Sequence, residues 1–249
     1  MKLDVAFSPR ELTASEVADR TVLVIDVLRA TTTICAALDR GARAVVPAVD
    51  TEDATRLEEV LGPADVVLAG ERNSVRIPGF KLGNSPSEMT ADVVQGKTLV
   101  MTTTNGTQAL LGTAGAREVF VAAAVNLSVA GAAARAALEE HGDLLILCAG
   151  RDHGFGFDDA FIAGCLAERA LGGRRRRKGL NDAALVAVDL VIRYRDRIER
   201  ALALSRAGRE LTARGFGSDV SAAAQVDAHP VLPVFRDRRI TLAQPGTRS

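Results

Sequence analysis

The stretch Thr21-Val-Leu-Val-Ile-Asp-Val-Leu-Arg-Ala-Thr-Thr-Thr33 decides the fold, because an apolar run leads through a polar loop into three threonines. A second stretch, Thr98-Leu-Val-Met-Thr-Thr-Thr-Asn-Gly-Thr107, repeats this pattern. Each continues through an apolar segment to Gly-Ala-Arg and then to another apolar run, so each predicts a strand, a loop, a helix and a second strand. The two units cover residues 21–50 and 98–126 and suggest an internal β-loop-α duplication.

The rest of the chain continues this alternation of short β-rich runs and helical patterns. Such alternation is typical of an α/β fold with three layers, in which helices cover both faces of a largely parallel or mixed sheet. We expect a single domain over residues 1–249. Its strands are expected near residues 22–25, 45–49, 66–69, 98–101, 119–123 and 144–148.

Local signals mark helix starts and breaks. Ser85-Pro-Ser-Glu88 combines a cap residue, a proline at the first helical position and a glutamate at the third, and Asp50 and Asn126 are plausible caps for the helices that follow them. Apolar residues at helical spacing over 185–202 predict one long amphipathic helix. It follows a basic, glycine-flanked loop at 172–179, and the chain closes with two short strands, 231–235 and 239–242, before a tail at 244–249.

The composition narrows the class of protein. The 249 residues carry a formal net charge of zero and are 47% hydrophobic, so we expect neither a nucleic acid nor a membrane surface as partner. Three cysteines without C-x-x-C spacing argue against disulfides and a zinc site. We expect a cytoplasmic protein that binds a small anionic ligand and could form a homodimer.

The threonines of the two repeats stand where each loop should enter its helix. Hydroxyls and free backbone N–H groups at a helix start form an anion site, because the first-turn donors lack intrahelical partners and the helix dipole favours negative charge. Two such sites indicate a phosphorylated or carboxylated ligand. The alternative is that the threonines simply cap their helices.

Charged side chains gather in the loops that should follow the predicted strands, where ligands bind in parallel α/β sheets. Asp26, Glu71 and Asp159 supply carboxylates, and the same loops hold arginines, hydroxyls and amides but no cysteine nucleophile and no histidine pair. This set suits phosphoryl transfer with Mg²⁺, which prefers oxygen ligands and needs few carboxylates. Asp26 could bind metal, activate water or act as a nucleophile, and the alternative is that it caps the next turn.

At these loops the sequence resembles the 2-phosphosulfolactate phosphatase family, also called ComB-like. The matching segments run from near residue 20 to near 240: Ile25-Asp-Val-Leu-Arg-Ala-Thr-Thr-Thr33, Gly70-Glu-Arg72, Gly79-Phe80 with Leu82-Gly-Asn-Ser-Pro86, Thr102-Thr-Thr-Asn-Gly106, Cys148-Ala-Gly150 with Asp159, and Gly215-Phe216 with Asp219-Val220. The resemblance implies a Mg²⁺-dependent acid phosphatase that converts (2R)-3-sulfo-2-phospholactate to sulfolactate and phosphate, a reaction of coenzyme M biosynthesis. It also implies an α/β fold distinct from other phosphatases.

We therefore expect a hydrolase of phosphate monoesters. The expected catalytic residues are Asp26, Arg29, Glu71 and Asp159, and the three carboxylates are the expected Mg²⁺ ligands. The expected substrate-binding residues are Thr31, Thr32, Thr33, Arg72, Asn84, Ser85, Thr104, Asn105, Gly106 and Arg151. The rival functions are a phosphosugar isomerase or phosphotransferase, and a non-catalytic anion-binding module.

Overall fold

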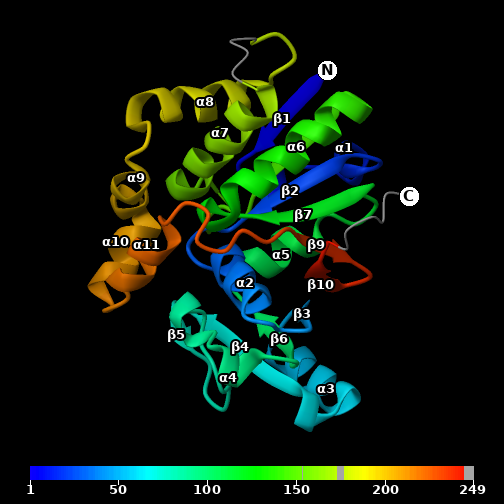
Figure 1. The fold of residues 1–249 in the computed structure, drawn as a ribbon, viewed down its shortest axis with the longest axis vertical. Helices are drawn as coiled ribbons and strands as arrows, with labels where there is room; N and C mark the ends of the chain where they lie inside the picture. Colours follow the sequence, from blue (N-terminus) through cyan, green and yellow to red (C-terminus); the bar gives the residue numbers. More distant parts are fainter. Residues whose placement is uncertain (153, 173–176, 244–249) are drawn as a thin grey trace.

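The computed structural model describes residues 1–152, 154–172 and 177–243. Figure 1 shows a sheet that runs through the molecule, with helices packed against it. The middle of the predicted basic loop, residues 173–176, and the predicted tail, residues 244–249, lie outside the described residues. Within the described part, none of the helices combines the length and the apolar character that crossing a bilayer requires.

The elements follow one another in an α/β order. The strands are β1 (Lys2–Ala6), β2 (Thr21–Ile25), β3 (Ala44–Pro47), β4 (Val66–Arg72), β5 (Val75–Arg76), β6 (Thr98–Thr102), β7 (Glu118–Ala122), β8 (Asp143–Cys148), β9 (Pro233–Arg236) and β10 (Arg239–Leu242). The α-helices are α1 (Ala14–Val17), α2 (Ala30–Asp39), α3 (Thr51–Leu61), α4 (Ala91–Val94), α5 (Gly106–Leu111), α6 (Leu127–His141), α7 (Phe157–Leu171), α8 (Asp182–Tyr194), α9 (Ile198–Leu204), α10 (Arg206–Ala213) and α11 (Gly217–Ala223). The 3-10 turns are η1 (Pro9–Glu11), η2 (Pro63–Asp65), η3 (Pro86–Glu88) and η4 (Ala124–Asn126).

The sheet consists of two parallel blocks joined by a hairpin. The strand order is β1-β8-β2-β7-β9-β10-β3-β6-β4-β5. The larger block, β1-β8-β2-β7, and the smaller block, β3-β6-β4, are each parallel throughout. The antiparallel hairpin β9–β10 bonds to β7 on one side and to β3 on the other. The predicted mixed, mostly parallel sheet is therefore confirmed, and the predicted closing strands are the ones that join its halves.

The two repeated sequence units cross between the blocks in opposite directions. The first unit runs from β2 in the larger block through α2 to β3 in the smaller block, and the second runs from β6 in the smaller block through α5 to β7 in the larger. As a result β2 pairs with β7 and β3 pairs with β6. The loops after β2 and β6 therefore meet at the junction of the two blocks.

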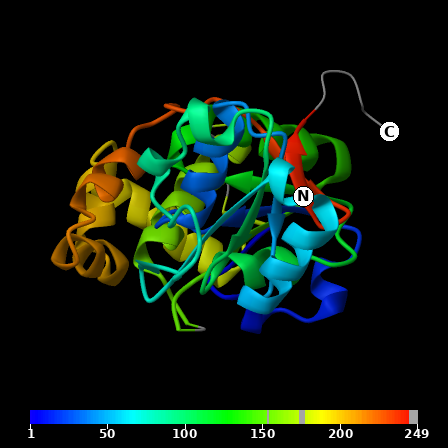
Figure 2. The same cartoon turned by 90° about the horizontal axis from the view of Figure 1, so that it is seen from below.

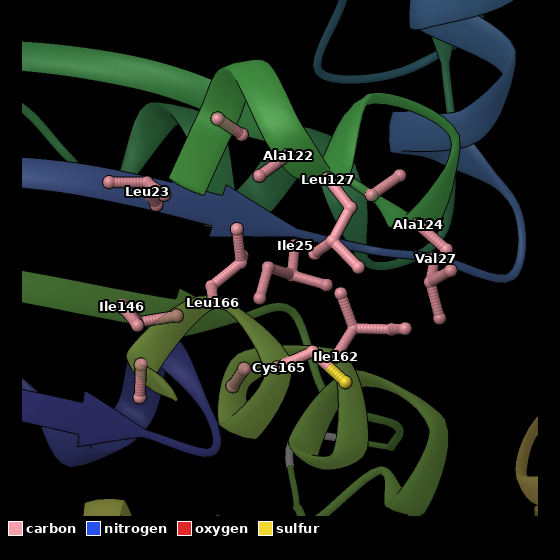
Figure 3. Packing of buried hydrophobic residues seen from close by; sticks show 14 of the residues in the cluster. Leu23, Ile25, Val27, Ala122, Ala124, Leu127, Ile146, Ile162, Cys165 and Leu166 are labelled. Carbon is pink, nitrogen blue, oxygen red and sulfur yellow. The ribbon is translucent and has the colours of Figure 1, made fainter. Parts of the chain in front are cut away.

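The strands β2, β3 and β6 are buried on both faces, which explains their mostly apolar sequence. Along β2, Leu23 and Ile25 face a core formed with α6 and α7, as Figure 3 shows. Val22 and Val24 face the opposite core, which includes the apolar side chains of α2 and α5. This alternation with period two places helices on both faces of the larger block.

The local capping signals are partly confirmed. The Asp50 side chain caps α3 by accepting a hydrogen bond from the Asp53 N–H at 2.8 Å. Ser85 and Glu88 form the predicted capping box, but it starts only the single 3-10 turn η3. Asn126 does stand at the start of α6, although its Oδ1 accepts instead from the Ala123 N–H at 2.8 Å.

The prediction of one long helix over 185–202 is wrong. The chain forms α8 and α9 and breaks between them at Arg195, whose φ is +49°. Residues 195–197 are all exposed, so no apolar contact continues the stripe across the break. Figure 2 shows the resulting α9–α11 segment, in gold to orange, at the opposite end of the molecule from the β9–β10 hairpin, in red.

Candidate active site

Asp26 lies directly after β2, at the junction of the two blocks. Its N–H donates to Thr31 Oγ1 at 3.2 Å, and its carbonyl accepts from the Thr31 N–H at 2.9 Å. The loop after β6 packs against it from the other block, because a Cβ on Gly106 would stand only 2.7 Å from Asp26 Oδ2. Gly106, expected to bind substrate, thus allows the second repeat to approach the aspartate of the first.

Four carboxylates form what we call the acidic cluster: Asp26, Glu71, Asp158 and Asp159. Burial raises the pKa of Asp26 to about 7, assisted by the charges of Asp158 and Glu71 and opposed by the N–H groups of Ala30 and Gly106. Burial also raises the pKa of Asp158 to about 6. It raises the pKa of Asp159 well above its ordinary value, as do the charges of Asp158 and Asp26. The cluster therefore holds at least one carboxyl group that changes charge near neutral pH.

Glu71, at the end of β4, clamps two loops together. Its Oε1 accepts from the backbone N–H and the hydroxyl of Thr104, both at 2.9 Å. Its Oε2 accepts from the Ser74 N–H at 2.6 Å. Thr104, expected to bind substrate, is thereby bound to Glu71 and fixes the loop after β6 against the loop after β4.

Asp159, in the first turn of α7, makes the equivalent clamp in the larger block. Its Oδ1 accepts from the Val27 N–H at 2.8 Å, and its Oδ2 accepts from the Gly150 N–H at 3.1 Å. These bonds hold the loop after β2 against the loop after β8. Asp159 is only 4% exposed, so these hydrogen bonds are buried.

The first threonine run shapes its loop through its own hydrogen bonds. Thr32 Oγ1 donates to the Val27 carbonyl at 2.9 Å, and Thr33 Oγ1 donates to the Asn84 carbonyl at 3.0 Å. Thr31 Oγ1 accepts from the Asp26 N–H. All three side chains are buried. The hydroxyl protons of Thr32 and Thr33 are therefore already engaged by the protein.

Arg29 is held by three separate segments. Its Nη1 donates to Asp219 Oδ2 at 2.6 Å and to Ser85 Oγ at 3.2 Å, and its Nη2 donates to the Ser74 carbonyl at 3.1 Å. The Phe216 ring lies against the guanidinium, 4.6 Å from its centroid to Cζ. Ser85, expected to bind substrate, also donates to Asp219 Oδ2, at 2.6 Å.

The other expected substrate-binding side chains have mixed surroundings. Arg72 donates to the Glu71 carbonyl at 2.9 Å and to Thr102 Oγ1 at 3.1 Å. Arg151 forms an ion pair with Glu210 of α10. Asn84 is buried, and its Oδ1 accepts no hydrogen bond within the described part of the chain.

A cavity of about 230 Å³ opens beside the acidic cluster. It is lined by Pro9, Arg10, Asn105, Gln108 and Ala149. Asn105 and Ala149 immediately precede the glycines that contact Asp26 and Asp159. Asn105, expected to bind substrate, thus borders open space. The much larger groove, of about 1430 Å³, lies along α7, α8 and α9 and contains none of the expected site residues.

Two site residues were not expected from the sequence. Asp158 looks like an ordinary acid in the first turn of a helix, and only its burial and the charges around it single it out. Asp219 lies 190 residues from Arg29 along the chain. Its signal is the Gly215-Phe216 and Asp219-Val220 match to the family, which marks the segment but not its partner.

The expected three-carboxylate metal set is not assembled as a ready-made site. Among the described residues, no three His, Cys, Asp or Glu side chains are grouped so that they could hold a metal ion. Glu71 and Asp159 each use both oxygens on N–H or O–H donors. A hydrated Mg²⁺, which keeps several waters and takes one or two carboxylates, still fits the cluster, because four buried carboxyl groups lie together there and the charges of Asp158 and Glu71 add to burial in raising the pKa of Asp26.

Comparisons with known proteins agree on one family. A family model described as 2-phosphosulpholactate phosphatase matches residues 6–238. Curated proteins named "Probable 2-phosphosulfolactate phosphatase" are similar over most of their length. The one from Symbiobacterium thermophilum is 40% identical over 231 residues, which cover 93% of this chain and 97% of the relative. The one from Deinococcus radiodurans is 42% identical over 216 residues, 86% of each chain.

Proposed function

The chain belongs to the 2-phosphosulfolactate phosphatase family, and from this premise we propose that it hydrolyses the phosphate ester of a 2-phospho acid. The substrate we propose is (2R)-3-sulfo-2-phospholactate, which would yield sulfolactate and inorganic phosphate. The observation that supports this reaction best is the acidic cluster, which is buried where loops from both blocks meet and contains carboxyl groups with pKa values of about 7 and about 6. Such values allow proton transfer in both directions near neutral pH.

The reaction requires two proton movements. Water forms a bond to phosphorus and loses a proton, while the bond from phosphorus to the ester oxygen breaks and that oxygen gains a proton. We assign both transfers to Asp26 and Asp158 as a pair, because the charge of Asp158 raises the pKa of Asp26. The ionised member accepts the proton from water and the protonated member donates one to the leaving oxygen.

A hydrated Mg²⁺ would bind beside the acidic cluster through its coordinated waters, which leaves Asp26 free to exchange a proton, and it would supply positive charge to the phosphoryl oxygens. Arg29 is the residue we assign to the same oxygens. Its Nη1 and Nη2 are bound to protein groups, but its Nε–H has no hydrogen-bond partner among the described residues. A guanidinium fixed in this way presents a donor without losing further side-chain entropy on binding.

The test is release of inorganic phosphate from phosphosulfolactate by the purified protein, with and without Mg²⁺ and after treatment with EDTA. We expect turnover that depends on Mg²⁺ and returns when the ion is restored. 2-Phospholactate and a neutral phosphomonoester serve as comparison substrates. Isomerisation or transfer to an acceptor without phosphate release would overturn the proposal, as would ligand binding without turnover.

A further inference from the structure

Asp219 makes the closest contacts to Arg29, and it comes from the opposite end of the chain. The ion pair at 2.6 Å is almost completely buried, since both side chains are only 3% exposed. The same Asp219 oxygen accepts from Ser85, which also contacts Arg29. The guanidinium, the carboxylate and the hydroxyl thus form a closed triangle of hydrogen bonds.

Two further contacts complete the surroundings of the guanidinium. Phe216, immediately before α11, supports it from the side through a cation–π contact. The Ser74 carbonyl accepts from Nη2, and the N–H of the same residue donates to Glu71 of the acidic cluster. Ser74 therefore links the orientation of Arg29 to the position of the acidic cluster.

Stability alone is a weak reason for such a pair. Removing two charges from water costs several kcal/mol, so a buried ion pair is often replaced by apolar side chains without loss of stability. Asp219 also cannot add positive charge to the site. What the contacts do accomplish is to fix the plane of the guanidinium and the direction of its remaining N–H group.

We propose that Asp219 is a positioning residue for the phosphatase reaction, which together with Ser85 and Phe216 orients Arg29 toward the phosphoryl group. The inference rests on the proposed role of Arg29 in that function. It reassigns Ser85 from binding substrate to orienting Arg29. It also makes the α9–α11 segment part of the catalytic apparatus, because Phe216 and Asp219 stand at the beginning of its last helix.

The main test is Asp219→Asn, which keeps the shape and an oxygen acceptor but removes the charge. We expect kcat to fall by ten- to a hundredfold with a much smaller change in KM, since a small misplacement of a positioned group costs about that much in rate. Asp219→Glu should recover only part of the loss. Affinity for inorganic phosphate, measured by calorimetry, should weaken in Asp219→Asn and gives a readout independent of turnover.

A double-mutant cycle separates positioning from a merely structural role. If Asp219 acts through Arg29, then Asp219→Asn should cost little more kcat in a protein that already carries Arg29→Ala. Additive losses would overturn the proposal. So would an unchanged kcat and phosphate affinity in Asp219→Asn accompanied only by a lower melting temperature.

The chain offers a control in a second, partly buried ion pair. Arg20 bonds to Asp4 at 2.9 Å, with side chains 7% and 15% exposed, and it precedes β2 whereas Arg29 follows it. Asp4→Asn should lower stability without changing kcat or phosphate affinity. If Asp219→Asn does not fold, Ser85→Ala tests the same triangle of hydrogen bonds. We expect Ser85→Ala to lower kcat by a smaller factor than that given above for Asp219→Asn and to leave KM unchanged. An unchanged kcat in Ser85→Ala would then overturn the proposal. Absence of phosphate release by the wild type would contradict the proposed function instead, and phosphate binding would still test the role of Asp219.

Discussion

Two carboxyl groups of the acidic cluster, Asp26 and Asp158, have pKa values raised to about 7 and about 6. Burial is the leading cause for both. A buried carboxyl group with a pKa near 7 does not favour the folded state, because the protein becomes less stable when that group ionises. Asp26 lies at the carboxyl end of β2, where ligands bind in α/β sheets, and this position indicates a role in the reaction.

Replacing Asp26 by Asn should lower turnover by about a hundredfold or more, because a positioned proton-transfer or charge-stabilising group is lost. Single-substrate kinetics at saturating Mg²⁺ measure this effect. Circular dichroism and the melting temperature must show that the variant is folded. Wild-type turnover in a folded Asp26→Asn protein would leave the aspartate with only a structural role.

The same substitution should change the dependence of stability on pH in the metal-free protein. Between the ordinary value of 3.8 and about 7, folded Asp26 binds a proton that the unfolded chain releases, so its contribution to the free energy of unfolding falls as pH rises through this window. Asp26→Asn removes this pH-dependent fall in the free energy of unfolding. We expect the variant to gain stability relative to wild type between about pH 4 and pH 7, by at most ~1.4 kcal/mol per unit of pKa shift.

Urea unfolding after EDTA treatment, at about pH 4 and about pH 8, measures this difference. A constant difference between variant and wild type at both values would mean that Asp26 has no raised pKa in the folded protein. Added Mg²⁺ at the higher pH should stabilise wild type more than the variant, because the ion relieves the charge that the substitution removes.

At the scale of elements, the site depends on how closely α5 approaches α2. A Cβ on Gly106, the first residue of α5, would stand 2.7 Å from both Asp26 Oδ2 and the Ala30 Cβ. Gly106 belongs to the second sequence repeat, both contacted atoms belong to the first, and the strands that lead into the two loops, β6 and β2, lie in different blocks. The glycine is therefore needed for the contact between the repeats.

Gly106→Ala should push α5 away from Asp26 and lower kcat strongly, with a loss of stability of about 1–3 kcal/mol from overpacking. Gly112→Ala, at the end of the same helix, is the control, because its nearest contact would be a looser 3.2 Å to the Gln108 carbonyl and its φ is −67°. Kinetics and chemical unfolding of both variants make the comparison. Equal effects from the two would show that helix disruption, and not the approach to Asp26, is responsible.

The strands were predictable from sequence because burial on both faces leaves unbroken apolar runs, such as the one that forms β2. The β1 strand was missed because Lys2 and Asp4 interrupt its apolar pattern. The break between α8 and α9 was missed because Arg195 takes a positive φ without glycine or proline as a signal. The position of each loop after a predicted strand was enough to place Asp26, Glu71 and Asp159 at one edge of the sheet. The hydrogen bonds that Glu71 and Asp159 accept from backbone N–H groups were not predictable, because they depend on backbone geometry that residue types do not encode.

For the whole molecule, the β9–β10 hairpin is the connection between the two parallel blocks within the sheet. Ile240 of β10 is fully buried and pairs with Val45 of β3, while Val234 of β9 pairs with Phe120 of β7. Asp26 and Asp159 belong to the larger block, and Glu71 belongs to the smaller one. The geometry of the acidic cluster therefore depends on this hairpin.

Ile240→Ala should destabilise the protein by about 2–5 kcal/mol, as expected for a large-to-small change in a core. It should also reduce kcat below the melting temperature, because the blocks lose their common packing. Leu242→Ala is the matched control on the same strand, since Leu242 is 41% exposed. Activity that tracks only the fraction of folded protein in Ile240→Ala would show that the hairpin supports the fold without tuning the cluster.

The hairpin also bears on how the protein acquires its structure over time. Each parallel block is built from strands distant in sequence, and the hairpin then joins residues such as Val45 and Ile240, which lie in the first and the last fifth of the chain. Pairings of such long sequence separation form slowly, because the entropy of closing the loop is lost before the contact stabilises it. Secondary structure should therefore return early during refolding from urea. Enzymatic activity should return later, when the two blocks are finally locked into one sheet.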